Sequence, residues 1–505
     1  MLELLLGNSF LSAIIAFAII LIPAIIIHEL GHFIAAKMVG ISVLEFGVGF
    51  PPRMVRLFWW GETEFTLNWL PIGGFVRPLG EDMVGPVVEQ DVPPDDDEYD
   101  EDKPKNITYI SEREELMARG VPEHKLQSVN ETKPWARIWF MVAGAVFNVV
   151  SAVIFFIIAA LTGIPTFVGH SLLLVDIPET SVFNQEQVFQ YDVVERVDGE
   201  YFTTYGEFFS LINDANGTVE LTMRHTNNVD TIEEATRDSF ETYTITVSAD
   251  DFTPTPYVLV TRVVEESPAD EAGLQAEDRI ISVNGKELDV DDPIALVTEE
   301  TNEFAGEAIE LLVENNGEVR EVLLTPRLDP PPGQGRIGIE ITAAWGASDG
   351  TFFTDAVNQI EYIPQSLPDS VAFGFNQTWD ILKQIAGIIP GLINGEISGG
   401  EARPVSIVGI SQIGGVLLQN SIRNSAPYDV LWFIAIVSIF LGVTNLLPFP
   451  PLDGGRILFV LIEIVRGKPV PVEVENMIYR IGIALLLLLG VIVIIFDIVN
   501  PLDLG

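Results

Sequence analysis

The stretch that most constrains this chain is Ile25–Ala36, which reads I-I-I-H-E-L-G-H-F-I-A-A. His28 and His32 are four residues apart, so a helix places both imidazoles on one face, where they can bind one metal ion together. Glu29 follows the first histidine, within reach of a water molecule at such an ion. The same letters occur on solvated helices, but residues 4–27 carry no charge. Because ionisable groups in an apolar span are costly and usually functional, we predict a zinc site inside a membrane.

The composition divides into an apolar part and an acidic part. The 505 residues are 48% hydrophobic, yet the net charge is -45, and the mean hydropathy is +0.33. These values agree if apolar residues are concentrated in membrane spans and acidic ones in water-exposed domains. The absence of cysteine excludes disulfides, thiolate metal sites and cysteine nucleophiles. A pI near 4.2 argues against nucleic acid as a partner. The remaining histidines, His124, His170 and His225, lie in polar or boundary stretches and are interpreted as incidental.

Four apolar stretches are long enough, or nearly so, to cross a bilayer. They are residues 4–27, 138–161, 430–447 and 481–496. The first lacks a basic start and a cleavage site, so we do not expect a removable signal peptide. Lys and Arg cluster between the first and second stretches and between the third and fourth, which predicts that these loops are cytoplasmic. The segment 165–428 and both termini are then expected outside the cell.

The two loops of the N-terminal half have opposite characters. Residues 43–76 alternate like strands and contain several glycines, which favours either an ordinary hairpin or a sheet that dips into the membrane beside the metal motif. Residues 82–132 are acidic, including V-P-P-D-D-D-E-Y-D-E-D, and we expect disorder there, with a weak helix near residues 111–119. We interpret this segment as a solvated insert rather than a regulatory arm.

The outer segment contains two similar units of mixed strand and helix. Residues 263–288 predict a strand, a turn, a short helix, a strand and an Asn284-Gly285 hairpin turn, and this resembles a PDZ domain. Residues 191–202 match the pattern partly and indicate a second, degenerate PDZ-like domain. Such domains bind peptide C-termini by strand addition, but they also serve as size filters or spacers, and both roles stay open.

A Pro/Gly-rich linker is expected after Pro326. Six apolar residues follow at helical spacing, with Asp380 and Lys383 among them: Phe375, Trp379, Leu382, Ile385, Ile389 and Leu392. A fifth span would fit this pattern, but the charges favour a helix lying at the outer membrane surface.

A third metal ligand must come from elsewhere in the chain, since a catalytic zinc usually has three protein ligands. Residues 445–456 read N-L-L-P-F-P-P-L-D-G-G-R and follow the third apolar stretch. Asp453 is the only acidic residue in this stretch, so it is a candidate ligand. Capping of the following helix is an equally good interpretation of Asp453 from the residues alone.

The two motifs together resemble the site-2 protease family of intramembrane zinc metalloproteases. The resemblance includes H-E-L-G-H at 28–32, N-x-x-P-x-P-x-L-D-G at 445–454, and K-P-W-A-R-I-W-F-M-V-A-G-A-V-F-N at 133–148. It also includes F-G-V-G-F-P-P-R at 46–53 and L-P-I-G-G-F-V-R-P-L-G-E-D at 70–82, which resemble the family's membrane-associated β-loop. PDZ domains between the second and third spans match the bacterial sigma-regulating branch. The chain departs from the family at Gly144-Ala145, where Gly-Pro is common, and in the length of its acidic insert.

The resemblance implies a fold and a set of residue roles. The fold is α-helical in the membrane, with about four transmembrane helices, a membrane-associated β-loop and α+β PDZ-like domains. His28, His32 and Asp453 are implied as zinc ligands and Glu29 as the general base. Asn445 is implied as a catalytic donor to the substrate backbone. Asn148 is a weaker candidate for the same task.

The implied function is cleavage of transmembrane segments of membrane proteins, as in regulated intramembrane proteolysis. The expected substrates are single-span proteins already trimmed outside, such as an anti-sigma factor or a remnant signal peptide. The expected location is the bacterial plasma membrane, with the catalytic site near its cytoplasmic side. A non-catalytic PDZ scaffold is the alternative, although the intact Glu29 argues against it. An ion transporter is a third possibility, disfavoured by the lack of an internal repeat.

These predictions divide the chain into seven segments. They are 1–81, the first span with the β-loop; 82–132, the acidic insert; 133–164, the second span; 165–250, the degenerate PDZ-like domain; 251–328, the PDZ domain; 329–427, the linker and surface helix; and 428–505, the third and fourth spans.

Overall fold

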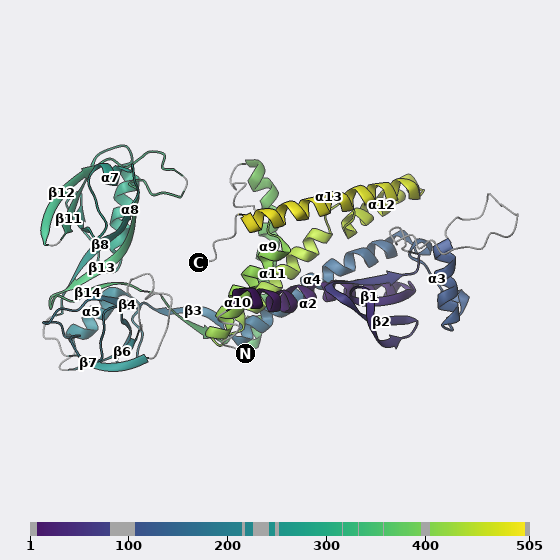
Figure 1. The fold of residues 1–505 in the computed structure, drawn as a ribbon, viewed down its shortest axis with the longest axis horizontal. Helices are drawn as coiled ribbons and strands as arrows, with labels where there is room; N and C mark the ends of the chain where they lie inside the picture. The colour runs from purple at the N-terminus through teal and green to yellow at the C-terminus, as the bar shows by residue number, and fades with distance from the viewer. Residues whose placement is uncertain are drawn as a thin grey trace. The chain divides into compact units, whose positions relative to one another are not determined.

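The computed structural model describes residues 8–80, 107–214, 218–225, 242–247, 252–315, 317–331, 333–356, 358–394 and 404–499. The chain folds into two compact units. Unit 1 comprises residues 1–164 and 362–505, and unit 2 comprises residues 165–361. Long helices dominate unit 1, whereas unit 2 is built on strands (Figure 1).

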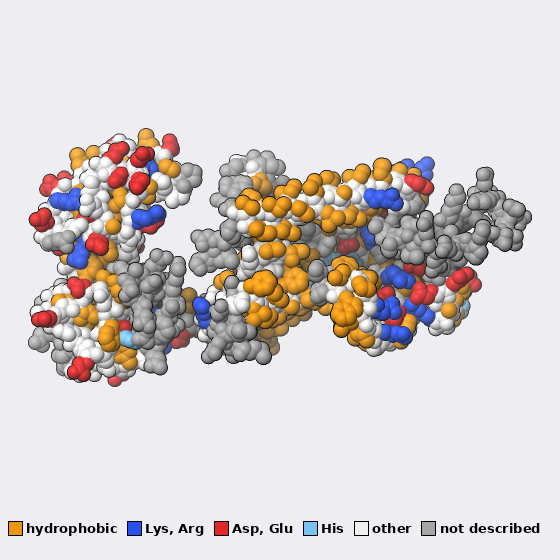
Figure 2. All heavy atoms as spheres, in the orientation of Figure 1, with side chains coloured by type: hydrophobic (Ala, Val, Ile, Leu, Met, Phe, Trp, Pro, Cys, Tyr) orange, Lys and Arg blue, Asp and Glu red, His pale blue; other side chains and the backbone are white. Residues whose placement is uncertain are grey.

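The helices of unit 1 are long and mostly apolar. They are α2 (Ser9–Val39), α4 (Pro134–Thr162), α9 (Leu367–Asn394), α10 (Ile407–Arg423), α11 (Tyr428–Asn445), α12 (Asp453–Arg466) and α13 (Val472–Val499). Within the described residues, four helices are long and apolar enough to cross a membrane: Phe10–Val39, Pro134–Thr162, Tyr428–Asn445 and Glu473–Val499. They overlap the four predicted stretches, and the number of spans that cross the membrane stays a prediction. Figure 2 shows hydrophobic side chains spread along α13, as expected for a surface that faces lipid.

Small residues let these helices approach one another closely. A Cβ added at Gly31 of α2 would lie 2.5 Å from the Ala143 carbonyl oxygen of α4, so α2 and α4 touch through their backbones. A Cβ at Gly442 of α11 would lie 3.0 Å from the Ala145 carbonyl oxygen, also on α4. Close approach of this kind is the usual basis of helix packing in lipid, where burial of apolar surface gives no driving force. Helix α4 is therefore held between α2 and α11.

Two further helices lie in the region expected as a linker with a surface helix. Helix α9 is the predicted amphipathic helix: Leu382 and Ile385 pack into a cluster with α4 and α11, whereas Phe375 and Trp379 are exposed. Its place at the outer membrane surface stays a prediction. Helix α10 had no counterpart in the predictions. It packs on α2, where a Cβ at Gly415 would lie 2.9 Å from the Ala13 nitrogen.

The predicted β-loop is a long, bulged hairpin of β1 (Val43–Trp60) and β2 (Thr63–Pro78). Residues 43–48 of β1 pair with 64–67 of β2 on one side and with 74–78 of β2 on the other. The segment 74–78 therefore forms one edge of the folded hairpin. Phe33, next to His32, packs against Phe46 and Phe65 of the hairpin, with ring centroids 5.7 and 5.4 Å apart. This contact fixes the hairpin against the helix that carries the metal motif.

The acidic insert is more ordered than predicted in its second half. Residues 107–132 form α3 (Ile107–Ala118) and the short 3-10 helices η1 (Glu123–Lys125) and η2 (Val129–Glu131). Leu116 and Leu126 are buried with Leu44 and Leu79 of the hairpin region, which supplies the apolar contact that the acidic first half lacks. The expected disorder is thus not found here, and the weak helix is present. Residues 81–106, which hold the acidic run, lie outside the described residues.

Unit 2 is organised on one continuous sheet, which has eleven strands within the described residues, in the order β12-β11-β9-β8-β13-β14-β4-β5-β6-β7, with β10 beside β9. The strands are β4 (Leu172–Asp176), β5 (Val193–Val197), β6 (Val219–Arg224), β7 (Thr242–Val247), β8 (Pro254–Val263), β9 (Arg279–Val283), β10 (Lys286–Glu287), β11 (Ile309–Asn315), β12 (Glu318–Leu324), β13 (Ile339–Ala347) and β14 (Phe352–Asp355). Helices α5 (Tyr205–Asp214), α7 (Pro268–Glu271) and α8 (Pro293–Glu303) complete the unit. The strands β3 (Ile164–Gly169) and β15 (Gln359–Ile363), where the chain enters and leaves unit 2, pair with each other.

Two separate hydrophobic cores divide this sheet into two lobes. One core is built mainly from residues 172–252 and the other from residues 258–341, in agreement with two successive mixed α/β units. The structure differs from the expected linker after Pro326, because β13 and β14 lie in the middle of the sheet. Trp345 of β13 is fully buried in the first core, whereas Ile337, just before β13, is buried in the second. The alternation of apolar residues in I-E-I-T-A-A-W was the signal for this strand.

Candidate active site

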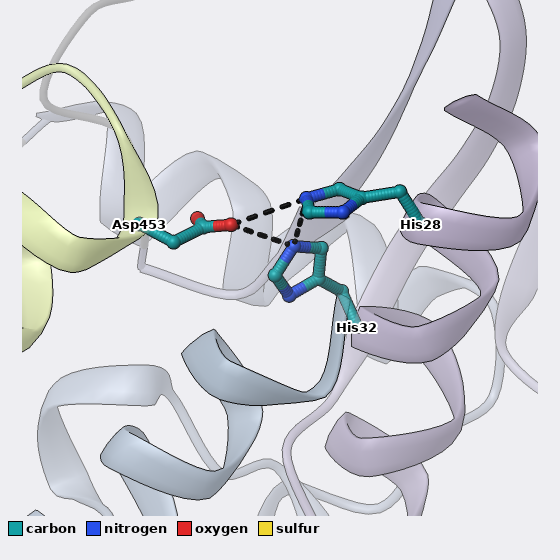
Figure 3. A group of neighbouring side chains, drawn as sticks. All are labelled: His28, His32 and Asp453. Carbon is teal, nitrogen blue, oxygen red and sulfur yellow. Dashed lines mark hydrogen bonds and ion pairs between the residues drawn. The ribbon is translucent and has the colours of Figure 1, made fainter. Parts of the chain in front are cut away.

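His28, His32 and Asp453 meet in one cluster, as Figure 3 shows. His28 Nε2 and His32 Nε2 are 3.2 Å apart, and each lies 3.2 Å from Asp453 Oδ2. The histidines are 5% and 7% exposed, and the Asp453 side chain is 17% exposed. Three atoms bound tetrahedrally to one ion at about 2.0 Å would be roughly 3.3 Å from one another, which matches this triangle. The residues that the sequence singled out are therefore brought together, although they are 425 positions apart in the widest pair.

The outer nitrogens of both imidazoles are held by α4. His32 Nδ1 lies 2.8 Å from the Phe140 carbonyl oxygen, an acceptor only, so Nδ1 carries the proton and Nε2 presents its lone pair. His28 Nδ1 lies 3.3 Å from the Asn148 side-chain amide, and the buried Asn148 Oδ1 has no other protein partner. If that amide is rotated by half a turn, Oδ1 accepts a hydrogen bond from the protonated Nδ1 of His28. Nε2 of His28 then presents its lone pair, as Nε2 of His32 does. Contacts of this type orient metal ligands in proteins.

Gly144 leaves room for the cluster. A Cβ added to Gly144 would lie 2.5 Å from His32 Nε2 and 2.7 Å from His28 Nε2, so any side chain here would collide with both donor atoms. Gly31, within the metal motif on α2, likewise has no side chain, and this leaves room for the Ala143 carbonyl of α4. The two glycines thus allow α4 to lie against the histidine face of α2.

Asp453 reaches the histidines because the chain turns sharply after α11. Residues 446–452 carry three prolines and end that helix, and α12 begins at Asp453 itself. A Cβ at Gly454 would lie 2.3 Å from the carbonyl oxygens of Leu446 and Leu447, so only glycine permits α12 to start against this turn. The first α12 residue is not capping its own helix: the N-cap is Leu452, and the Asp453 carboxylate contacts the histidines instead. The carboxylate is therefore directed to the histidines and not to the start of α12.

A cleft of about 460 Å³ opens at the cluster. Its lining includes Ile25, His28, Glu29, His32, Phe50, Gly73, Gly74, Phe75, Val76, Phe140, Leu441, Asn445, Pro451, Leu452, Asp453 and Arg456. Glu29 lines this cleft together with Val76, in the edge segment of the hairpin. A Cβ at Gly74 would lie 3.3 Å from the Glu29 Cγ, so the glycine-rich strand passes directly beside this carboxylate. The cleft therefore combines the metal-binding cluster, a carboxylate and a strand edge.

The two asparagines lie in different places. Asn445 lines the cleft, and its Nδ2 donates to the Leu441 carbonyl oxygen at 3.0 Å. Asn148 contacts His28 and is not part of the cleft lining. Sequence reasoning missed Gly144 and the orienting contact of Asn148. The spacing of the two residues, four apart on α4, places them on one helix face and is the signal that could have found them.

A comparison with protein families covers almost the whole chain. The model of peptidase family M50 matches residues 16–489. The chain belongs to this family.

Among relatives, "Regulator of sigma E protease" of Haemophilus influenzae is 26% identical over 97% of this chain and 99% of its own length. "Zinc metalloprotease RasP" of Geobacillus kaustophilus is 26% identical over 96% of this chain and 97% of its own length. "Regulator of sigma-E protease RseP" of Escherichia coli is 25% identical over 95% and 97%. This M50 peptidase is thus a zinc metalloprotease, and its helices make it an intramembrane one.

The residues present fit zinc. Two imidazole nitrogens and one carboxylate oxygen form a common catalytic donor set, which leaves a fourth position open. The donor atoms converge, α4 fixes the ring orientations, and Gly144 keeps the space between the donors and α4 clear. Within the described residues, this is the one group of three His, Asp or Glu side chains that is arranged to hold a metal ion.

Proposed function

We propose that this M50 peptidase cleaves the transmembrane segments of single-span membrane proteins at the cleft beside His28, His32 and Asp453. The observation that supports this most is the convergence of the three donors, Glu29 and a strand edge at one cleft formed by candidate membrane helices. His28, His32 and Asp453 are the proposed zinc ligands. When bound, zinc supplies Lewis-acid chemistry and lowers the pKa of water.

Glu29 is the proposed general base. Its carboxylate takes a proton from the attacking water and later gives it to the leaving amine of the cut peptide bond. The Glu29 side chain lies against Gly74 of the hairpin edge, where a Cβ would be 3.3 Å from the Glu29 Cγ. Asn445 lines the same cleft and is the proposed donor to the substrate backbone. Its Nδ2 also donates a hydrogen bond to the Leu441 carbonyl oxygen.

The hairpin edge is the proposed binding surface for the substrate backbone. Among the residues that the structure describes, the segment 74–78 pairs with 43–48 along one side only. Gly74 and Val76 of this segment line the cleft, and Gly74 lies directly beside Glu29, so this edge borders the cleft. An extended substrate segment can add to this edge as a further strand. A helical substrate must first unwind, because the amides of a helix are already hydrogen bonded.

Substrate selection is proposed to involve unit 2. The names of relatives point to regulation of a sigma factor, so an anti-sigma factor is the proposed class of substrate, and remnant signal peptides are a second. The elements β8, α7, β9 and β10 follow the order expected at residues 263–288, and this supports the proposal of a PDZ-like domain there. We propose that unit 2 captures peptide C-termini or screens substrates for prior trimming outside the membrane. The proposed location is the bacterial plasma membrane, with the cleft towards its cytoplasmic side and unit 2 outside.

The decisive experiment compares the wild type with Glu29→Gln and Asp453→Ala on a tagged single-span substrate, with bound zinc measured for each protein. We expect the wild type to cut, Glu29→Gln to retain zinc without cutting, and Asp453→Ala to lose zinc. Cleavage by Glu29→Gln at the wild-type rate would refute the base role and move the scaffold interpretation to the front.

The strand edge is tested separately by deleting Gly73 and Gly74. We expect cleavage to fall while zinc content is unchanged, because the donors lie on other elements. Normal cleavage by the deletion variant would remove the hairpin from substrate binding.

A further inference from the structure

A cavity of about 330 Å³ lies where α4, α12 and α13 meet, and no residue of the metal-binding cluster lines it. Its wall includes Arg137 near the start of α4, and both Glu475 and Tyr479 near the start of α13. Both helices are candidate membrane helices, so the cavity lies at one end of two spans. At the ends of membrane spans, the polar head groups of phospholipids border the hydrocarbon core. In Figure 2, charged side chains gather at this end of α13, while hydrophobic ones cover its length.

Two polar groups in this wall are buried without a hydrogen-bond partner among the described residues. Arg137 is 8% exposed, and its Nη2 donates to Glu463 at 2.6 Å, but its Nε has no acceptor. The hydroxyl group of Tyr479, a residue that is 4% exposed, has no partner either. Its neighbour Arg456 is a donor only, so it offers no acceptor for the O–H proton. Because leaving a buried donor unpaired is costly, both groups indicate an acceptor that binds in the cavity.

The wall also contains a carboxylate that receives no hydrogen bond from the part of the chain that the structure describes. Arg137 and Glu463 neutralise each other as an ion pair. Glu475 is partly buried, and the positive charges that act on its carboxylate are those of Arg456 and Arg137. A ligand that fits this wall therefore has an anionic group for the unpaired donors and a cationic donor for Glu475.

We propose that the cavity binds the head group of a phospholipid that carries both a phosphate and a primary ammonium group. The phosphate oxygens accept hydrogen bonds from Arg137 Nε and the Tyr479 hydroxyl, and the ammonium group donates to the Glu475 carboxylate. An ethanolamine head group has this chemistry. A choline head group has no N–H to donate to Glu475, and a glycerol head group has no positive charge, so neither satisfies the whole wall.

A membrane lipid is the source of this head group that the surroundings favour. Apolar side chains line the cavity beside the charged ones, including Met141, Phe459 and Val460. Exposed apolar side chains neighbour the wall on α12 and α13: Leu458, Leu461, Met477 and Ile481. Acyl chains can cover such a surface, whereas a soluble phosphate ester would gain nothing from it.

The experiment measures, by native mass spectrometry, how tightly the delipidated full chain in detergent binds added lipid. The lipids are dioleoyl phosphatidylethanolamine, phosphatidylcholine and phosphatidylglycerol. We expect the ethanolamine lipid to bind at least about tenfold more tightly than the other two, the usual effect of a hydrogen bond between charged groups.

Two conservative variants locate the site. Tyr479→Phe removes only the hydroxyl group and should weaken binding of the ethanolamine lipid about tenfold. Glu475→Gln keeps the volume of the side chain and should abolish the preference for ethanolamine over choline, because a neutral amide attracts an ammonium group far less than a carboxylate does. Glu473→Gln, on the same helix but outside the cavity wall, is the matched control and should bind lipid like the wild type.

Three outcomes would overturn the inference. Equal binding of the three lipids by the wild type would leave water as the occupant of the cavity. An ethanolamine preference that survives in both variants would place the lipid elsewhere on the protein. Displacement of the lipid by an equal concentration of free phosphoethanolamine would make the ligand a soluble ester. The selectivity of the wild type tests the inference even where a variant fails to fold.

Discussion

At the scale of single residues, the site depends as much on what is missing as on what is present. Gly144 supplies no side chain, and this absence is what lets two imidazole nitrogens converge beside α4. Asn148, one turn further along, presents its amide to the back of His28. One face of α4 thus provides the space for the two imidazoles of α2 and a contact that orients one of them.

Gly144→Ala is predicted to weaken zinc binding by at least about tenfold, since disturbing the support of metal ligands commonly costs 10- to 100-fold in affinity. The added methyl carbon would lie within 2.7 Å of both Nε2 atoms, so the rings must move apart. Competition with a chelator measures the affinity. Gly490→Ala on α13 is the control, because a Cβ there would have no neighbour within 4 Å. Equal affinity for Gly144→Ala and wild type would show that the rings can relax without cost.

The residues of the His28, His32 and Asp453 cluster could be singled out from the sequence, and the residues that support the cluster could not. His28, Glu29 and His32 are separated by fixed helical steps, so their relation follows from periodicity alone. Asp453 was left open between ligand and cap, because its distance from the histidines depends on a turn that prolines and glycines shape in three dimensions. Arg456 attracted notice only as a loop charge, since nothing in its neighbours shows which cavity it borders.

At the scale of elements, the hairpin is held by Arg119, whose guanidinium donates hydrogen bonds to the hairpin backbone. Arg119, just after α3, donates to the Leu44 carbonyl oxygen at 3.0 Å and to the Glu62 carbonyl oxygen at 3.1 Å. It also pairs with Glu115 and lies 4.8 Å from the ring centroid of Trp59. The ordered part of the acidic insert thus braces the element that borders the cleft. Its high charge content predicted disorder, because a sequence does not show that its charges will meet partners.

Arg119→Ala is predicted to destabilise the hairpin by about 1–3 kcal/mol, the usual cost of leaving buried carbonyl groups without a donor. Hydrogen–deuterium exchange should become faster in β1 and β2 and stay unchanged in unit 2. Arg113→Ala removes a pair with the more exposed Glu131 and should change the exchange rates far less. Unchanged exchange in β1 and β2 of Arg119→Ala would mean that Phe33 and its aromatic neighbours hold the hairpin alone.

Unit 2 contains an ionisable group that makes its stability depend on pH. Glu300 of α8 is fully buried and accepts hydrogen bonds from Asn284 Nδ2 at 2.6 Å and Lys286 Nζ at 2.5 Å. The Lys286 ammonium, followed by the Asn284 amide, lowers the pKa of Glu300 below its ordinary value of 4.5. A lowered carboxyl pKa stabilises the folded state above the unfolded pKa, and this contribution is lost as the pH falls through the folded pKa.

Glu300→Gln should therefore lower the melting temperature of unit 2 at pH 7 by about 2–4 °C, the shift expected for 1 kcal/mol in a unit of this size. The difference from the wild type should shrink below pH 4.5. Calorimetry of the full chain at pH 7 and pH 3.5 measures both values. A difference that is the same at the two pH values would assign the effect to packing rather than charge.

At the scale of the whole molecule, individual helices could be predicted from the sequence better than the pairing of strands that are distant along the chain. The four candidate membrane helices were found because long apolar runs leave little freedom. The continuity of the sheet across both lobes of unit 2 was not predicted, since it depends on β13 and β14 bridging two cores that are separate in sequence. Pairing between distant strands has no local signature.

The cysteine-free sequence allows a direct test of sidedness. Glu340→Cys on β13 should react with a membrane-impermeant maleimide in intact cells, and Glu115→Cys on α3 should react only after lysis. Both side chains are exposed, at 55% and 44%, so a lack of reaction cannot be attributed to burial. The reverse pattern would invert the proposed topology and place the cleft towards the outside.

The one-sided pairing of the hairpin edge has a consequence for substrate choice. A strand edge recognises main-chain groups, which every sequence shares, so it reads little of the side chains it receives. Discrimination then falls on the substrate's own helix. Sequences rich in glycine or β-branched residues unravel at low cost, and stable leucine- and alanine-rich helices resist. Such a protease would prefer substrates whose transmembrane helices unwind easily. A substitution that stabilises the substrate helix would then reduce cleavage, whether it lies at the cleavage site or far from it.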